Sequence, residues 1–361
     1  MKKMIFVIFA IIFNCSNAQN FDLVDKAIEE AISDSIFPGA AILVGSSRDV
    51  YYEKAYGYYT YDSSSNQVQN SSIFDLASVT KAFGTNFCVM KLVDEGKLNI
   101  EKPVSFYLPE FSARKKGNVK VADLLIHESG LQSYYTPKDG ETRDDILDTI
   151  KSLPLNYETG FKTVYSCLNF VTTMMVVESI VDEPMYKFYA DNFTNPLKMD
   201  RTMFIPSKGF INDCVPTTPD LQGIVHDPLA RGLEGLSGNA GLFSTTEDLA
   251  KLCQLLLNSG TYDGERYLEE ETIKEFTKPY SDHTSRAIGF DTRSGDHPSS
   301  GHFFNEGTYG HLGYTGTSIW IDPVKDLFVI LLTNRVYPDD TASIRSTRPK
   351  VYDAVMLSME Q

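Results

Sequence analysis

Strand-like segments lie near both ends of this chain, whereas helical patterns fill most of the part between them. Residues 40–44 and 50–56 have the pattern of two strands joined by a polar turn, and residues 316–321 and 327–333 are two more strand-like runs, separated by Asp322-Pro323. Strands from the two ends can share one sheet if the middle of the chain is an excursion from it. We therefore predict an α/β fold of the α+β kind, with one antiparallel sheet built from both chain ends and flanked by helices.

The helical patterns give the predicted organisation of the chain. Apolar residues recur at helical spacing over residues 21–36 and again from Ser78 to Glu95, where Gly96 ends the pattern. The segment Ser244-Thr245-Thr246-Glu247 has the pattern of a capping box that opens another helix. We expect one domain over residues 19–361, with an α/β part at about 19–96 and 236–361 and a mostly helical insert at about 97–235.

The first eighteen residues have the pattern of a secretory signal peptide. Lys2 and Lys3 precede an apolar run over residues 4–13, and Ser16-Asn17-Ala18 offers small residues at a cleavage site after Ala18. The apolar run is too short to span a bilayer as a helix. The sequence thus predicts a secreted or periplasmic protein with no stable membrane span.

Charge and residue spacing limit the partners and cofactors. The chain of 361 residues has a formal net charge of -15 and no long run of Lys and Arg, so no nucleic-acid partner is expected. No His-Glu-x-x-His or zinc-like spacing occurs, and His127, His226, His283, His297 and His302 are interpreted as structural or surface residues. We expect no metal or other cofactor. The oligomeric state is left open.

Four cysteines remain after the predicted signal peptide: Cys88, Cys167, Cys214 and Cys253. Cys88 and Cys253 lie in apolar helical patterns and are predicted to be small core residues. Four cysteines allow three disulfide pairings, between which the sequence does not choose.

The strongest chemical motif is Ser78-Val79-Thr80-Lys81, at the start of a predicted helix. Residues three apart share a helix face, so Lys81 can lie beside Ser78. A serine hydroxyl needs a neighbouring base before it is a good nucleophile, and lysine can be that base. The same spacing recurs from Ser112 to Lys115, in a charged stretch without an apolar helix behind it, and is interpreted there as surface.

Two further boxes accompany the motif, Tyr165-Ser166-Cys167 and His311-Leu312-Gly313, and in order and spacing the three resemble the active-site boxes of one known family. This is the serine β-lactamase and D-Ala-D-Ala carboxypeptidase family, and the resemblance is greatest to its class C-like branch, peptidase S12 and related esterases. The similarity extends over residues 37–335 and includes residues 123–131, 225–228 and 238–245. It implies a β-lactamase/transpeptidase-like fold.

The resemblance also implies roles for individual residues. Ser78 would be the acylated nucleophile, Lys81 its base partner and Tyr165 a second base. His311 and Gly313 would lie on the strand that edges the site, with Gly313 leaving room for the substrate backbone. The backbone N–H groups of Ser78 and Tyr314 would form the oxyanion hole.

The chain departs from the family pattern at two positions. Cys167 stands where most members have Asn, and a thiol hydrogen-bonds only weakly. Asn169 is two residues further on, and whether it substitutes is left open. His311 stands where typical β-lactamases have Lys, so the site loses a fixed positive charge for a substrate carboxylate.

These residues predict a secreted serine hydrolase that cleaves an amide or ester through an acyl-enzyme. A D-Ala-D-Ala carboxypeptidase-like enzyme or D-amino-acid peptidase is expected, acting on a small molecule or peptide such as a fragment of peptidoglycan. The alternatives are a small-ester esterase or β-lactamase of the same family. An alternative of another class is a catalytically silent ligand-binding member of the fold.

Overall fold

The computed structural model describes residues 19–281, 284–295 and 298–360. Six strands in this part of the chain form one antiparallel sheet, in the order β2 (Val50–Gly57), β1 (Gly39–Gly45), β12 (Leu327–Thr333), β11 (Ser318–Asp322), β10 (Tyr309–Leu312) and β9 (Asp291–Thr292). The first and last long strands are neighbours, and Leu43 pairs with Ile330. The prediction of one antiparallel sheet built from both chain ends is therefore confirmed.

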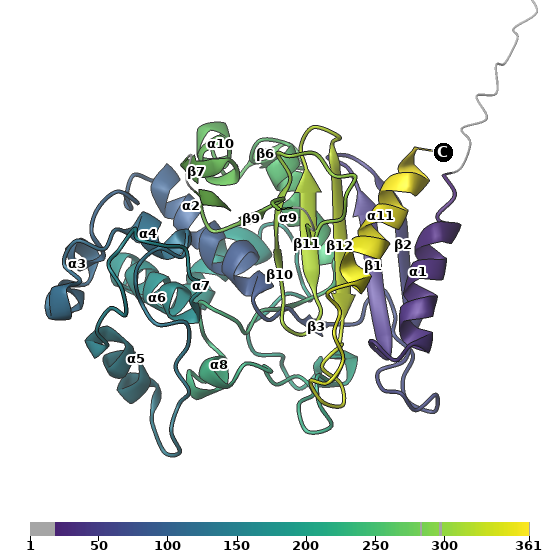
Figure 1. Cartoon of the computed structure of the whole chain (residues 1–361), viewed down its shortest axis with the longest axis horizontal. Helices are drawn as coiled ribbons and strands as arrows, with labels where there is room; N and C mark the ends of the chain where they lie inside the picture. Colours follow the sequence, from purple (N-terminus) through teal and green to yellow (C-terminus); the bar gives the residue numbers. More distant parts are fainter. Residues whose placement is uncertain (1–18, 282–283, 296–297, 361) are drawn as a thin grey trace, which may run out of the picture.

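Helices cover both faces of this sheet, which explains why β1 and β12 are buried along their whole lengths. On one face, α1 (Asp22–Ser33) and α11 (Thr347–Met359) lie side by side, drawn in purple and yellow in Figure 1. Ala40, Ile42 and Val44 point to this side and join its apolar cluster. Ala41 and Leu43 point to the other side, into the largest cluster of the protein.

The second face is covered by α9 (Thr246–Leu257) and by the helical segment that follows Ser78. The N-cap of α9 is Thr245, whose hydroxyl accepts a hydrogen bond from Asp248 N at 3.3 Å. The helix predicted here is present, but the predicted cap, Ser244, is wrong by one residue. Ser244 instead belongs to the short strand β4 (Phe243–Ser244), and its hydroxyl contacts the Thr202 hydroxyl at 2.7 Å.

Between β2 and β4 the chain forms mostly helices and loops, which lie in the other half of the molecule in Figure 1. Its helices are α2 (Asn86–Asp94), α3 (Val104–Tyr107), α4 (Val121–Leu125), α5 (Arg143–Ser152), α6 (Cys167–Val181), α7 (Met185–Tyr189) and α8 (Pro228–Gly232). The remaining strands are β3 (Phe74–Asp75), which pairs with β4, and the hairpins β5 (Thr261–Tyr262) with β6 (Glu265–Arg266) and β7 (Pro279–Ser281) with β8 (Thr284–Ala287). The remaining α-helix is α10 (Glu270–Thr277), and short 3₁₀- or π-helical turns lie at Lys81–Thr85, Pro109–Lys115, Ala190–Thr194 and Ile211–Asp213.

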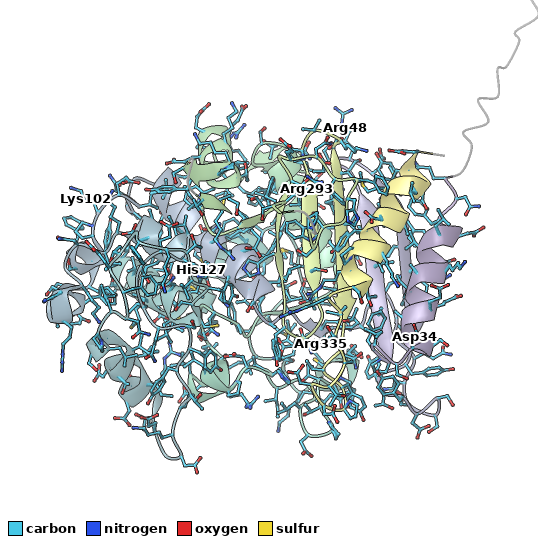
Figure 2. All side chains as sticks on the ribbon, viewed as in Figure 1. Asp34, Arg48, Lys102, His127, Arg293 and Arg335 are labelled. Atoms are coloured by element: carbon cyan, nitrogen blue, oxygen red, sulfur yellow. The ribbon has the colours of Figure 1, made fainter. Side chains whose placement is uncertain are left out.

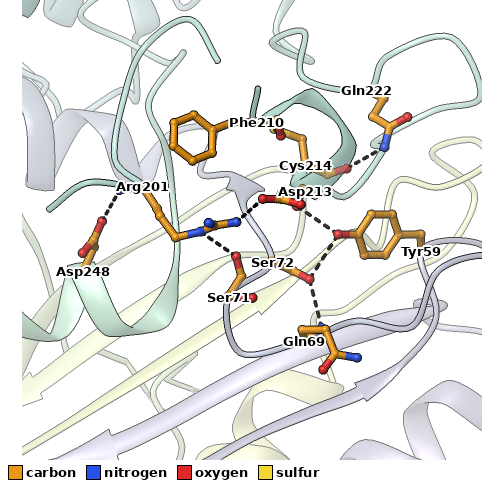
Figure 3. A network of polar contacts seen from close by, with 10 residues as sticks. All are labelled: Tyr59, Gln69, Ser71, Ser72, Arg201, Phe210, Asp213, Cys214, Gln222 and Asp248. Atoms are coloured by element: carbon orange, nitrogen blue, oxygen red, sulfur yellow. Dashed lines mark hydrogen bonds and ion pairs between the residues drawn. The ribbon is translucent and has the colours of Figure 1, made fainter. Parts of the chain in front are cut away.

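A polar network ties the loop before β3 to the helical half (Figure 3). Arg201 is its centre: its Nε donates to Ser71 O at 2.9 Å, and its guanidinium forms an ion pair with Asp213. The carbonyl of Asp213 accepts from the Tyr59 hydroxyl at 3.0 Å, and the Phe210 ring lies under the guanidinium. This network fixes the segment that leads into the predicted nucleophile.

Several sequence predictions concern the rest of the chain. The predicted signal peptide, residues 1–18, lies outside the described residues, as do His283 and His297. Cys88 and Cys253 are fully buried in the apolar core, as predicted, and the four cysteines of the described chain are free thiols. No helix among the described residues is long and apolar enough to cross a membrane.

Candidate active site

Ser78 lies at a tight turn between β3 and a helical segment. The turn is made by Ala77, whose φ of +46° is in the left-handed region. The buried carboxylate of Asp75 holds this turn, because its Oδ1 accepts from Ala77 N at 2.8 Å and its Oδ2 from His226 N at 2.6 Å. Burial raises the pKa of Asp75 to about 6, although both hydrogen bonds oppose the shift.

Lys81 is fully buried one turn after Ser78, at the start of a π-helical turn over Lys81–Thr85. Its Nζ donates to Ser78 Oγ at 2.9 Å and to the carbonyl of Asn239 at 2.7 Å. The contact that the Ser-x-x-Lys spacing predicts is therefore present. Burial works to lower the pKa of Lys81, but the neighbouring Cys167, Tyr165 and Asp227 work to raise it, and the net shift is upward.

The second Ser-x-x-Lys copy has a different geometry. Ser112 donates its hydroxyl to Pro109 O at 2.8 Å. Arg114 and Lys115 have φ of +59° and +68°, so the chain leaves the helical path between the serine and the lysine. This copy is surface, as the sequence predicts.

Tyr165 reaches the site from the loop before α6. Its ring centroid lies 5.1 Å from Lys81 Nζ and 4.5 Å from the ring of His127. Burial raises the pKa of Tyr165, while the charge of Lys81 and polar contacts with Lys81 and Ser78 oppose the shift. The phenol and Lys81 form a coupled pair beside Ser78, in which proton loss from one group depends on the other.

His127 was expected to be a structural or surface histidine, and it is structural within the site wall. Its Nδ1 accepts from Ser166 N at 3.1 Å, which fixes the residue between Tyr165 and Cys167. Burial lowers the pKa of His127 well below its usual value, so the ring is neutral. Figure 2 labels His127 in the helical half and Arg335 at the opposite, sheet side of the site.

Cys167 and Asn169 take different positions on α6. Cys167 is its first residue and is nearly buried, and burial raises the pKa of its thiol against the effect of Lys81 and the Asn239 side chain. Asn169 is fully buried; its Oδ1 accepts from the Ser129 hydroxyl at 2.6 Å, and its Nδ2 lies 3.3 Å from Nδ1 of His127. The Asn169 amide is therefore held by these two residues rather than by Lys81.

His311 lies on β10, which edges the site. Its Nδ1–H donates to the carbonyl of Leu312 at 2.8 Å, so Nε2 is left as an acceptor. Among the described residues Nε2 has no hydrogen-bond partner. Burial lowers the pKa of His311 to about 4, which makes it neutral at physiological pH.

Gly313 is required by a close approach within the protein. A Cβ at this position would lie 2.0 Å from Thr317 Oγ1 and 2.5 Å from the carbonyl oxygen of Leu76. Thr317 Oγ1 donates to that same carbonyl at 2.9 Å, which joins the loop between β10 and β11 to the turn before Ser78. Contacts inside the protein therefore require glycine at position 313, in addition to the room for substrate that the sequence predicts.

Tyr314 is the next residue after Gly313, and neighbouring side chains contact both sides of its ring. Its half-exposed ring stacks on His226, with centroids 5.9 Å apart, and the Arg335 guanidinium lies 4.5 Å from its centroid. Arg335 Nε also donates to the Tyr314 carbonyl at 2.8 Å. Within the described part of the chain, neither the backbone N–H of Tyr314 nor that of Ser78 donates to a protein acceptor. Both are available to an oxyanion.

Ser78, Tyr165, His311 and Tyr314 share one cleft of about 690 Å³. A larger groove of about 940 Å³ lies in the helical half, but none of the predicted site residues lines it. The cleft also contains charged groups that the sequence did not single out: Arg286, Asp291, Arg335, Asp340, Arg345 and Arg348.

Arg286 and Arg348 differ in how they are held. Arg286, on β8, pairs with Asp291, and its guanidinium carbon lies 5.7 Å from the Tyr165 ring. Arg348 is buried on α11 and donates to the carbonyls of Gly313 and Thr317 at 2.7 and 2.8 Å. Burial lowers the pKa of Arg348 to about 10, so it keeps its charge near neutral pH. Both residues come from segments without a motif, so only the fold brings them to Ser78.

Known proteins share this architecture. The chain is 34% identical over 355 residues to an N-acetylmuramyl-L-alanine amidase of Bacillus subtilis, covering 86% of this chain and 80% of the relative. It is 28% identical over 387 residues to a protein of Escherichia coli O157:H7 named "Putative D-alanyl-D-alanine carboxypeptidase", covering 94% and 88%. A penicillin-binding protein homologue from Caulobacter crescentus has the same fold, with a TM-score of 0.78, 19% identity and coverage of 95% and 98%.

A family profile that matches most of the chain identifies the family. The β-lactamase family profile matches residues 24–351, from α1 into α11, so it includes both ends of the sheet and the helices between them. The chain therefore belongs to the β-lactamase family of serine hydrolases.

Proposed function

We propose that this protein is a secreted serine acyl hydrolase of D-Ala-D-Ala carboxypeptidase type, which cleaves an amide next to a carboxylate-bearing leaving group. The observation that carries the proposal is the pair Ser78 Oγ and Lys81 Nζ, 2.9 Å apart in a cleft with two free backbone N–H groups.

The chemistry follows from these positions. Ser78 Oγ attacks the carbonyl carbon, and its proton passes to the Lys81–Tyr165 pair in the form of the enzyme in which that pair has lost one proton, so that either the Lys81 amine or the Tyr165 phenolate accepts it. The backbone N–H groups of Ser78 and Tyr314 bind the oxyanion. The pair returns the proton to the leaving amine as the carbon–nitrogen bond breaks. Water then attacks the ester on Ser78, which releases the acid and restores the serine.

The position of Arg286 favours a substrate whose leaving group carries a carboxylate. His311 is neutral, because burial lowers its pKa to about 4, so it supplies no fixed charge. The Arg286 guanidinium lines the same cleft beside Tyr165, where the proton is returned to the leaving group. A bidentate guanidinium is well suited to a carboxylate, and Asp291 holds it in place.

A second candidate is hydrolysis of the amide between a muramyl lactyl group and L-alanine. It is favoured by the Bacillus subtilis relative, an N-acetylmuramyl-L-alanine amidase with 34% identity. The steps at Ser78 would be the same, and only the acyl group and the leaving peptide would differ.

A turnover panel separates these substrates. It contains an N-acyl-D-Ala-D-Ala peptide, an N-acetylmuramyl-L-alanyl peptide, nitrocefin and p-nitrophenyl butyrate. We expect the first to be cleaved fastest by the wild type and not by Ser78→Ala. Preference for the muramyl peptide would support the second candidate, preference for the ester or nitrocefin would support an esterase or β-lactamase, and no turnover would support a silent binder.

A matched pair of arginine variants tests whether Arg286 binds a carboxylate of the substrate. Arg286→Gln should raise KM for the D-Ala-D-Ala peptide at least about tenfold, but should leave the ester, which has no carboxylate, nearly unchanged. Arg293→Gln makes the same charge change on a residue outside the cleft and should alter neither. An equal loss for both substrates in Arg286→Gln would contradict the role of Arg286.

Export is part of the proposal, since the first eighteen residues have the pattern of a signal peptide. Expression of the full chain, followed by fractionation and N-terminal sequencing, should give a mature protein that begins at Gln19. Cell-associated protein that still carries Met1 would contradict it.

A further inference from the structure

The segment Val225–Pro228 links three walls of the active site. The backbone N–H of His226 donates to Asp75 at 2.6 Å, and the His226 ring stacks on Tyr314. Asp227 follows, directly before α8. None of the proposed catalytic steps uses this aspartate.

The Asp227 carboxylate accepts three hydrogen bonds. Its Oδ1 accepts from Ala230 N at 2.8 Å, which caps α8, and from Asn239 Nδ2 at 3.1 Å. Its Oδ2 accepts from the Tyr134 hydroxyl at 3.0 Å. The Tyr134 hydroxyl in turn accepts from Leu229 N at 2.9 Å. The carboxylate is therefore fixed at both oxygens.

Asn239 connects this carboxylate to the catalytic lysine. Its side chain is clamped at both ends, because Nδ2 donates to Asp227 and Oδ1 accepts from the Ser237 hydroxyl at 2.7 Å. Its backbone carbonyl accepts from Lys81 Nζ at 2.7 Å. A continuous chain of contacts runs from Asp227 through Asn239 and Lys81 to Ser78.

Lys81 also needs a negative charge nearby. It is fully buried, and no carboxylate of the described residues forms a direct ion pair with it. An unpaired buried ammonium is costly. Cys167 and Tyr165 act most strongly to raise the pKa of Lys81, and the charge of Asp227 adds to their effect; Asp227 is the one carboxylate among these contributors.

The other titratable groups around Lys81 do not supply this charge. They are Tyr165 and Cys167 at the start of α6, His127 after α4 and His311 on β10. Burial raises the pKa of Tyr165 and of Cys167, so near neutral pH both are uncharged, and they act on Lys81 as anions only at high pH. Burial lowers the pKa of the two histidines.

We propose that Asp227 is a positioning residue for acylation, which holds Asn239 against Lys81 and supplies the counter-charge of the buried ammonium. The inference rests on the proposed roles of Ser78 and Lys81. A capping residue for α8 alone would affect stability only, whereas a counter-charge also sets the proton affinity of Lys81.

Asp227→Asn tests this directly, because the amide keeps the size of the side chain and removes its charge. The pKa of Lys81 is measured by NMR titration of protein with ¹³Cε-labelled lysine, with the Lys81 signal assigned from Lys81→Arg. We expect it to fall by about one unit in Asp227→Asn. Tyr134→Phe is the matched control, since it removes one hydrogen bond to Asp227 without changing charge, and should shift it by less than about 0.3 units.

The pH profile of Ser78 labelling by a fluorophosphonate gives a second readout. The limb that reports Lys81 should move to lower pH by the same amount in Asp227→Asn, whichever protonation state reacts. A folded variant whose lysine pKa and profile match the wild type would overturn the inference. If the wild type is not labelled at all, the proposed function fails, while the NMR titration still decides whether Asp227 controls Lys81.

Discussion

Gly313 offers the most specific test of how the site is assembled, because its substitution by alanine adds a single methyl group. That methyl would lie 2.0 Å from Thr317 Oγ1 and 2.5 Å from the Leu76 carbonyl oxygen, far inside contact distance. Overpacking of this kind costs roughly 1–3 kcal/mol. Thr317 would also lose its 2.9 Å hydrogen bond to Leu76, which is worth about 1 kcal/mol.

We therefore expect Gly313→Ala to lower the free energy of unfolding by about 3 kcal/mol. The methyl group separates β10 from the turn before Ser78, so the two oxyanion N–H groups move apart. Loss of such a donor costs about 10²–10³ in rate. The rate of Ser78 acylation by a fluorophosphonate should fall by about 100-fold.

Urea unfolding followed by fluorescence measures the stability, since the single tryptophan, Trp320, is buried on the neighbouring strand β11. Gly307→Ala is the matched control, because a Cβ there meets nothing within 4 Å. Thr317→Ala in the Gly313→Ala background should restore part of the stability by removing the closest clash. Equal stability and equal labelling rates for Gly313→Ala and Gly307→Ala would show that the close approach at Gly313 does not hold the site together.

Three further predictions concern other parts of the structure. Arg201→Met keeps the aliphatic packing but removes the hydrogen bond to Ser71, and should lower stability by about 1–2 kcal/mol in thermal or urea melts. Burial raises the pKa of Asp75 from 3.8 to about 6, so its contribution to stability is full below pH 3.8 and is lost as the pH rises through 6. Asp75→Asn should therefore remove roughly 3 kcal/mol from the change of the unfolding free energy with pH, as measured by urea unfolding between pH 4 and 7. Cys167→Asn should speed acylation by a fluorescent penicillin about tenfold, since an amide oxygen accepts from Lys81 more strongly than a thiol; an unchanged rate would show that the thiol is not limiting.

Local sequence patterns predict the parts of this protein that depend on neighbouring residues. The spacing of Ser78 and Lys81 predicts their contact because both residues lie on one helical turn. The paired strand-like runs predict the sheet because a short turn joins the strands of each pair. The cap of α9 was placed one residue early, since Ser244 and Thr245 are both good caps and the pairing of Ser244 with Phe74 decides between them.

Other parts of the site depend on tertiary contacts that no local pattern predicts. Arg286 reaches the cleft because β8 contacts β9, the neighbour of β10, and Arg348 reaches it because α11 holds its guanidinium against the Gly313 carbonyl; neither residue stands in a motif. Asn239 and Asp227 lie within segments that resemble the family, yet the Asn239 carbonyl that accepts from Lys81 lies 158 positions further along the chain, and Asp227 contacts Asn239 rather than Lys81. The resemblance marked these segments but did not assign them a role.

Ser78 is the proposed acylated nucleophile, and intact-mass labelling shows whether it takes up an acyl group. Wild type, Ser78→Ala and Ser112→Ala are treated with a fluorophosphonate and with a fluorescent penicillin. Ser112 is the control because it stands in the same Ser-x-x-Lys spacing but donates its hydroxyl to Pro109 on the surface. We expect one adduct on the wild type and on Ser112→Ala, and none on Ser78→Ala. An adduct that persists in Ser78→Ala, or a wild type that takes up neither probe, would contradict it.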